Sequence, residues 1–480
     1  MSLRRADPRF ALPRPVTTAT VVGDLPGWRD GLEQAGVEVI SGRGELVVSP
    51  AGRATEALAL DPELLVLEGG RPARRLRAAG WSPLVLLPLP DAERPELLLP
   101  AGHPAPVRYA VRHWRPGTST ATRARNVLAR ELVARRIVPP GRRTLTAASR
   151  SGGDPFFVSA AREALEVEPA DWFASFGRWA KPVSRGAFFL FAGQDPAPAW
   201  VLKFARIPGA ERLFDRDERG LRLAERSPPV VASHAPRLVG RLDVGGFYAS
   251  IETAAQGEAL VAALDSSRPR SERLAAVERI AEWLVRLGDE TAAPPAALEA
   301  ERRRLAAEVV PRWEAEGLPQ DVVEELPAVP AVFQHGDVFG ENVILDERGG
   351  FTIVDWESAR EHGLPLWDLF YFLTRAIAML DDLRAEEERE EHFVRLWRGE
   401  LASSEVLFHW TRRAVAAGGI PPQAVGSLAT LLWLSYALLD LDQVAEIGET
   451  DGAAPPPTTA LFARRWLTEP GLGPGWDRWR

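Results

Sequence analysis

The sequence VFQHGDVFGENVILDERGGFTIVDWESA, at residues 332–359, contains the most informative pattern in the chain. Its two short apolar runs flank the turn sequence DERGG and predict a loop that leads into a hairpin. Asp337 and Asn342 lie on the loop, and Asp355 follows the second predicted strand. A carboxylate, an amide and a second carboxylate on one hairpin form an oxygen-rich cluster. Such a cluster suits a hard cation, for example Mg²⁺ that bridges phosphates.

This cluster leaves Asp337 free to orient a hydroxyl nucleophile and to accept its proton. The motif HGDVFGEN, followed by IVDWE, resembles the phosphotransferase motifs of the aminoglycoside phosphotransferase and choline kinase family, whose fold is protein-kinase-like. The motifs of this resemblance extend over about residues 173–373. The resemblance implies that Asp337 is the catalytic base and that Asn342 and Asp355 are Mg²⁺ ligands.

The same resemblance implies two supporting residues. His335 would shape the catalytic loop, and simple packing within the loop is the alternative for this histidine. The segment HGLPLWDLFYFL, at residues 362–373, is similar to the start of the helix that follows in the family. Asp368 in this segment would have a structural role.

Phosphoryl transfer also needs a cation that holds the phosphates of the nucleotide. Lys203 alternates with apolar neighbours in AWVLKFA, which predicts a central strand. An unpaired lysine inside a sheet would be costly, so an anionic partner is expected. Glu218 in the next helical segment is the predicted partner, with Glu211 and Glu225 as alternatives. A lysine at the rim of an edge strand is the competing interpretation.

The composition makes two of these residues conspicuous. The chain has 480 residues and 58 cationic side chains, of which only Lys181 and Lys203 are lysines. Asn also occurs only twice, as Asn126 and Asn342. The bias most simply reflects a coding preference for Arg. Because Lys supplies a compact point charge where Arg has a bulkier planar fork, its use at Lys203 supports the predicted role.

Two further segments are expected to contact the nucleotide. In VSRGAFF, the backbone N–H groups of Ser184, Arg185 and Gly186 could approach the phosphates, and a plain hairpin turn is the alternative. After the strand-like sequence GFYASIE, the segment from Glu252 to Ala254 resembles the hinge of the family. Backbone groups of a hinge would meet the adenine.

The whole chain is predicted to be α+β: a two-lobed, protein-kinase-like phosphotransferase preceded by a small α/β (Rossmann-like) domain. Residues 1–150 would form the small domain, whose role is not readable because the turn VVGDLPGW lacks the spacing G-x-G-x-x-G. Residues 151–258 would form the nucleotide-binding small lobe. Residues 259–480 would form a helical large lobe for catalysis and acceptor binding.

Composition and charge exclude several other classes. The chain has no Cys, so disulfides and thiolate metal sites are excluded. Residues 261–480 carry a net charge of −16, which argues against nucleic acid as a partner. The amino terminus has no apolar signal-peptide core, so a cytoplasmic location is expected. The apolar stretch 424–439 is shorter than the roughly 20 residues that a bilayer requires, and we expect a buried helix and no membrane span.

The patterns together predict transfer of the γ-phosphate of ATP or GTP to a hydroxyl of a small molecule, such as an aminoglycoside, an amino alcohol or a sugar. A nucleotide-binding pseudokinase that regulates a partner is one alternative, although Lys203, Asp337, Asn342 and Asp355 form a full catalytic set. A protein kinase is the other. Trp356 and the early helix start after it leave little room for an activation loop.

Overall fold

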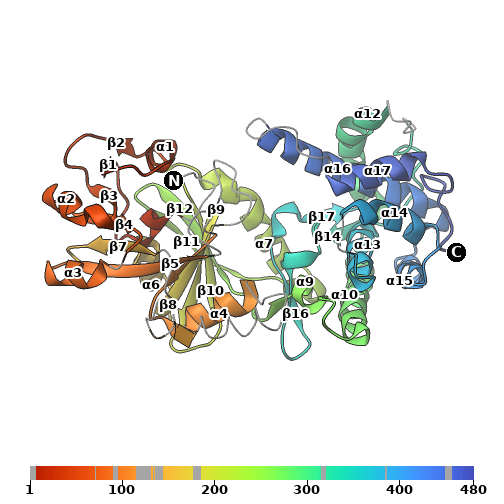
Figure 1. The fold of residues 1–480 in the computed structure, drawn as a ribbon. Coiled ribbons are helices and arrows are strands. Elements are labelled where there is room, and N and C mark those ends of the chain that lie inside the picture. The colour runs from red at the N-terminus through yellow and green to blue at the C-terminus, as the bar shows by residue number, and fades with distance from the viewer. Residues whose placement is uncertain are drawn as a thin grey trace. The chain divides into compact units, whose positions relative to one another are not determined.

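The chain is described here by a computed structural model, and it has the mixed α+β fold that the sequence predicts (Figure 1). Contacts divide it into two compact units. Unit 1 comprises Met1–Asp215 and Arg237–Gln256, and unit 2 comprises Arg216–Pro236 and Gly257–Arg480. The residues described by the structure are 7–70, 72–89, 96–114, 131–132, 135, 144–176, 185–314, 321–383, 386–448 and 457–480.

Unit 1 is built on one twelve-stranded sheet (Figure 1). In sheet order its strands are β11 (Leu238–Val244), β12 (Phe247–Thr253), β10 (Trp200–Ala205), β9 (Arg185–Ala192), β8 (Pro169–Ser175), β6 (Leu97–Pro100), β5 (Ser82–Leu89), β7 (Leu145–Ser149), β4 (Leu64–Glu68), β3 (Leu46–Pro50), β1 (Thr18–Val21) and β2 (Glu38–Val39). Strands β2, β1, β3 and β4 pair in parallel. The other pairs are antiparallel.

Helices cover both faces of the parallel strands, as expected for an α/β layer. Helix α1 (Trp28–Gln34) packs into the larger core on one face. Helices α2 (Ala54–Ala59) and α3 (Ala73–Ala78) pack into a separate core on the other face. Among the described residues, unit 1 also contains helices α4 (Pro104–Trp114) and α6 (Phe156–Ala164) and 3-10 turns at Pro8–Ala11, Ala51–Arg53 and Glu211–Phe214.

The sheet continues without interruption from the α/β region into the predicted small lobe. Leu97 and Leu98 of β6 pair with Ser175 and Ala174 of β8. The predicted boundary at residue 150 therefore lies inside unit 1. The division into three domains stays a prediction.

Segments far apart in the sequence share the core beneath strand β10. The ring centroids of Phe10 and Phe204 are 4.4 Å apart, and Phe204 is the residue after Lys203. Beside it, buried Asp7 accepts hydrogen bonds from Arg9 and lies 3.9 Å from buried Arg206. The amino-terminal segment is thus packed against the strand that contains Lys203.

Within its described residues, unit 2 is mainly helical, with three pairs of short strands and one isolated β-bridge. Its helices are α7 (Asp215–Arg226, which begins at the last residue of unit 1's first segment), α8 (Pro229–Ala232), α9 (Leu260–Ala263), α10 (Arg270–Glu290), α11 (Glu299–Arg304), α12 (Val310–Trp313), α13 (Trp367–Leu380), α14 (Glu386–Trp397), α15 (Ser404–Ala417), α16 (Val425–Gly448) and α17 (Thr458–Thr468). Its strands are β13 (Glu258–Ala259), β14 (Val332–Gln334), β15 (Val343–Leu345), β16 (Phe351–Ile353) and β17 (Arg360–Gly363).

Helix α16 contains the long apolar stretch of the sequence. Among the described residues, Pro422–Asp442 is the one helical segment that is long and apolar enough to cross a membrane. Its most apolar window has a mean hydropathy of 1.5. However, 78% of its most apolar window is buried inside the structure. Leu431, Leu432 and Trp433 are fully buried. This burial agrees with the predicted core helix.

Candidate active site

The predicted hairpin is present, as strands β15 and β16. Val343 pairs with Ile353, and Leu345 pairs with Phe351. Asn342 directly precedes β15, and Asp355 follows β16 by two residues. Because the strands are antiparallel, both residues lie at the same end of the hairpin, where the Val354 N–H donates to the Asn342 carbonyl over 2.8 Å.

The loop before the hairpin brings Asp337 and Asn342 into direct contact. The Nδ2 of Asn342 donates to Oδ2 of Asp337 over 2.8 Å and to the Asp337 carbonyl over 3.1 Å. Since Nδ2 is used in this way, Oδ1 is the atom that Asn342 can offer to a cation.

The Asp337 side chain is partly buried. Burial raises the pKa of the Asp337 carboxyl above its ordinary value, whereas the Tyr371 hydroxyl, Arg375 and Asn342 hold this pKa down. A raised pKa makes a carboxylate a better proton acceptor, as a general base requires. The donors keep the charged form accessible.

Asp355 has a backbone conformation that non-glycine residues rarely adopt. Its φ is 66° and its ψ is 64°, in the left-handed region. The buried Trp356 supports this turn, because its indole N–H donates to the Ile353 carbonyl over 2.7 Å. Strained conformations of this kind concentrate at functional sites.

Helix α7 contacts the backbone after Asp355 directly. A Cβ atom on Gly220 would lie 1.9 Å from the Trp356 carbonyl oxygen, so only glycine allows this approach. Glu218, two residues earlier on α7, is buried and lies 3.8 Å from Arg222.

Asp368, at the start of α13, anchors the backbone of the loop that contains Asp337. Its Oδ2 accepts from the His335 N–H over 2.7 Å, and its Oδ1 accepts from the Gly336 N–H over 2.8 Å. Burial raises the pKa of Asp368 to about 6, although both N–H groups act against this rise. Gly336 has a φ of 90°, and a Cβ there would lie 2.8 Å from that of Ser358.

His335 has the geometry of a loop-shaping residue. Its ring is fully buried, and burial lowers its pKa to about 4, so the imidazole is neutral at pH 7. Nδ1 accepts from the Asp337 N–H over 3.1 Å, which leaves the ring proton on Nε2. The ring also packs edge-on against Trp356, at a centroid distance of 4.6 Å.

We expect Asp368→Asn to destabilise unit 2 and to lower activity, because an amide cannot accept both N–H bonds through two oxygens. Loss of a bond to a charged acceptor costs roughly 1.5–3 kcal/mol. Thermal unfolding followed by tryptophan fluorescence should therefore show a melting temperature lowered by several degrees. Glu361→Gln, at an exposed position, is the matched control. Equal melting temperatures for both variants would contradict the anchoring role.

Lys203 lies on a central strand of unit 1, because β10 is placed between β9 and β12. The register pairs Lys203 with Ser250, and Val201 with Glu252, so Lys203 and Glu252 are diagonal neighbours on one face of the sheet. Their Nζ and Oε2 atoms are 3.1 Å apart, and the side chains are 18% and 6% exposed. This position excludes the edge-strand alternative.

The anion that the structure places beside Lys203 within unit 1 is therefore Glu252, which the sequence pointed to only as a hinge residue. Glu218 belongs to unit 2, and its predicted pairing with Lys203 stays a prediction. A cross-strand pair depends on the register of β10 and β12, which hydrophobic alternation does not specify. The sequence signal that could have indicated this pair was the presence of Glu252 in the strand-like stretch GFYASIE.

The predicted nucleotide-contacting backbone is only partly described. Ser184 lies outside the described residues. Arg185 and Gly186 are the first residues of β9, and a Cβ on Gly186 would lie 2.3 Å from the Phe204 ring. Packing against Phe204 thus explains this glycine. In the hinge segment, the Ala254 N–H already donates to the Ala199 carbonyl over 2.9 Å. The nucleotide-binding roles of these residues stay predictions.

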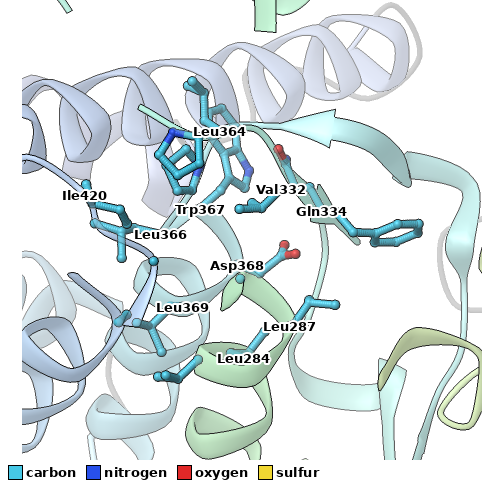
Figure 2. Close-up of a pocket in the computed structure, with 17 residues that line it drawn as sticks. Leu284, Leu287, Val332, Gln334, Leu364, Leu366, Trp367, Asp368, Leu369 and Ile420 are labelled. Carbon is cyan, nitrogen blue, oxygen red and sulfur yellow. The ribbon is translucent and has the colours of Figure 1, made fainter. Parts of the chain in front are cut away.

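A small cavity lies beside the strand that leads into the loop of Asp337 (Figure 2). It is lined by apolar side chains of α10, α13 and the loop before α13, together with Gln334 and Asp368. Its volume is about 30 Å³, which is enough for a water molecule but not for a nucleotide. The buried Oε1 of Gln334 has no hydrogen-bond partner among the described residues, so a water there is physically reasonable.

The residues at the hairpin end fit a magnesium ion. Within the described part of the chain, no group of three or more His, Asp or Glu side chains could hold a metal. Mg²⁺, however, is commonly held by one or two carboxylates together with substrate phosphates. Asp355 and Oδ1 of Asn342 are oxygen donors of the required kind.

Residues 179–414 match the model of a family described as the phosphotransferase enzyme family. A search of curated proteins finds no match. Similar solved structures include an aminoglycoside phosphotransferase of Streptomyces rimosus, with 19% identity, coverage of 49% of this chain and 83% of that chain, and a TM-score of 0.28. An aminoglycoside-3'-phosphotransferase of type VIII has 18% identity, coverage of 58% and 87%, and a TM-score of 0.27. The bifunctional kinase-methyltransferase WbdD has 13% identity, coverage of 85% of both chains, and a TM-score of 0.25.

Proposed function

Because residues 179–414 belong to the phosphotransferase enzyme family, we propose that this protein transfers the γ-phosphate of ATP or GTP to a hydroxyl of a small molecule. Aminoglycosides, amino alcohols and sugars are the acceptor classes that we favour. The main support is the hydrogen-bonded pair of Asp337 and Asn342, next to a hairpin that brings Asp355 to the same end.

In this proposal each residue has a separate task. Asp337 orients the acceptor hydroxyl and accepts its proton. Asn342 and Asp355 would bind Mg²⁺, which neutralises phosphate charge when bound. Lys203 holds the nucleotide phosphates as a point charge. Asp368 and His335 hold the catalytic loop in place, through the N–H groups that they bind.

One charge beside Asp337, the carboxylate of Asp440, favours an acceptor with a cationic group, whereas the guanidinium of Arg375 acts in the opposite direction. Asp440 on α16 interacts electrostatically with Asp337, and it contributes to the raised pKa of that carboxyl. The Thr459 hydroxyl donates to Oδ2 of Asp440 and so orients it. An ammonium group of an amino sugar or amino alcohol would be attracted to this pair of carboxylates.

An acceptor panel tests the proposal directly. Purified protein with Mg·ATP or Mg·GTP would be incubated with aminoglycosides, choline-like alcohols and sugars, and both nucleoside diphosphate release and product mass would be measured. We expect one class to gain a single phosphate. Phosphate found only on added proteins would favour a protein kinase. Bound nucleotide without consumption would favour a pseudokinase. The expected cytoplasmic location stays a prediction.

We expect Asp355→Asn to weaken the apparent affinity for Mg²⁺, because a carboxylate ligand is replaced by a neutral amide. The Mg²⁺ concentration at half-maximal turnover should rise by roughly tenfold or more. Glu347→Gln, an exposed substitution in the turn of the same hairpin, should leave the titration unchanged. A titration of Asp355→Asn that overlays that of the unmodified protein would refute the ligand assignment.

A further inference from the structure

Two tyrosines from the long helices of unit 2 hold the catalytic loop. The rings of Tyr371 on α13 and Tyr436 on α16 are stacked, with centroids 4.2 Å apart and an angle of 7° between planes. The Tyr436 hydroxyl donates to the Gly336 carbonyl. The Tyr371 hydroxyl lies close enough to the Asp337 side chain to lower the pKa of that carboxyl. The stack thus contacts both the backbone and the carboxylate of the loop.

We propose that Tyr371 is a positioning residue for Asp337, and that its hydroxyl and the Nδ2 of Asn342 together fix the orientation of the carboxylate toward the acceptor. This inference rests on the proposed function. The two donors come from independent elements, one from the loop before β15 and one from α13. A carboxylate held by two donors has less freedom to rotate than one held by a single donor.

The environment of Tyr371 makes it a dependable donor. Its side chain is buried, and burial raises the pKa of its phenol well above the ordinary value, so the hydroxyl keeps its proton. The Arg375 guanidinium lies 5.7 Å from the Tyr371 ring and 5.3 Å from the Phe339 ring. With Tyr436 stacked on Tyr371, these contacts hold the phenol in one place.

The motif spacing does not point to this residue. Tyr371 lies within the apolar run LFYFL, which is typical of a core helix, and it is 34 positions after Asp337. Only the packing of α13 beneath the loop brings its hydroxyl to the carboxylate.

Tyr371→Phe is the decisive variant, because phenylalanine keeps the ring and removes only the hydroxyl. A misplaced catalytic group costs roughly 10- to 100-fold in rate, so we expect kcat to fall by that factor. The KM values for nucleotide and acceptor should stay within about twofold, since neither ligand loses a ground-state contact. Tyr109→Phe, a buried tyrosine of unit 1, is the matched control and should keep normal turnover.

A double variant separates positioning from a general structural role. In the Asp337→Asn background the base is absent, so Tyr371→Phe should cause no further loss of kcat. A structural role would lower kcat by the same factor in both backgrounds. That outcome, or normal kcat in Tyr371→Phe alone, would overturn the inference.

A measurement without turnover tests the contact itself. The chain has four tyrosines, so ¹³C labelling at the tyrosine Cζ atom would give a simple NMR spectrum. The Tyr371 signal, assigned by its loss in Tyr371→Phe, should move in Asp337→Asn and stay in place in Glu361→Gln. A signal that does not move in Asp337→Asn would overturn the inference whatever the acceptor. Lack of turnover with every acceptor would instead contradict the proposed function.

Discussion

Asp337→Asn is expected to lower turnover by roughly 10²-fold or more, because an amide cannot accept the proton of the acceptor hydroxyl. Asparagine has nearly the same size as aspartate and keeps an oxygen that can accept from Asn342, so the loop should keep its shape. Binding of the Mg·nucleotide should therefore survive. The structure supports this separation of turnover from nucleotide binding. Asp368 and His335 hold the loop through the backbone N–H groups of residues 335–337, and these bonds do not involve the Asp337 side chain.

Steady-state kinetics with the best acceptor and a titration of Mg·nucleotide binding together check this result. Glu341→Gln, at an exposed position of the same loop, is the control for nonspecific effects. Near-normal turnover in Asp337→Asn would refute the assignment of the base. A loss of nucleotide binding equal to the loss of turnover would instead indicate damage to the loop.

The second large effect is expected for Lys203→Met. Loss of a cation that stabilises charge on the phosphates should lower kcat/KM for the nucleotide by roughly 10²- to 10³-fold. The substitution also removes the positive charge 3.1 Å from Glu252, which is 6% exposed. Breaking a buried ion pair from one side costs roughly 3–5 kcal/mol, so the melting temperature of unit 1 should fall as well.

The double variant Lys203→Met, Glu252→Gln separates these two effects. Replacement of both members of a buried ion pair is often close to neutral for stability. The melting temperature should therefore recover relative to Lys203→Met, whereas turnover should stay low. Recovery of turnover together with stability would show that the charge of Lys203 is not required for catalysis. An unchanged melting temperature in Lys203→Met would contradict a stabilising pair.

Local patterns predicted the parts of the site that depend on neighbouring residues in the sequence. The hairpin follows from two apolar runs around the turn DERGG, and it brings Asn342 and Asp355 to one end through antiparallel pairing. Asp337 is five positions from Asn342, so their contact needs only one loop. The family match over residues 179–414 confirms the resemblance that these motifs indicated.

Distant pairings were not predictable in the same way. Strands β6 and β8 were not predicted from the sequence, and their pairing joins the α/β region and the predicted small lobe in one sheet. The packing of Phe10 against Phe204 likewise links residues almost 200 positions apart. Hydrophobic periodicity reports which face of an element is buried, but not which element covers it.

The amino-acid sequence by itself determined the α+β class, the hairpin and the positions of Asp337, Asn342, Asp355 and Lys203, because these features arise from local spacing and from residue types that the composition otherwise avoids. Only the tertiary structure decided that Glu252 lies beside Lys203 and that Tyr371 reaches Asp337. Both contacts depend on strand register and helix packing. Those are set by the burial of many side chains at once, and no single stretch of sequence contains that information.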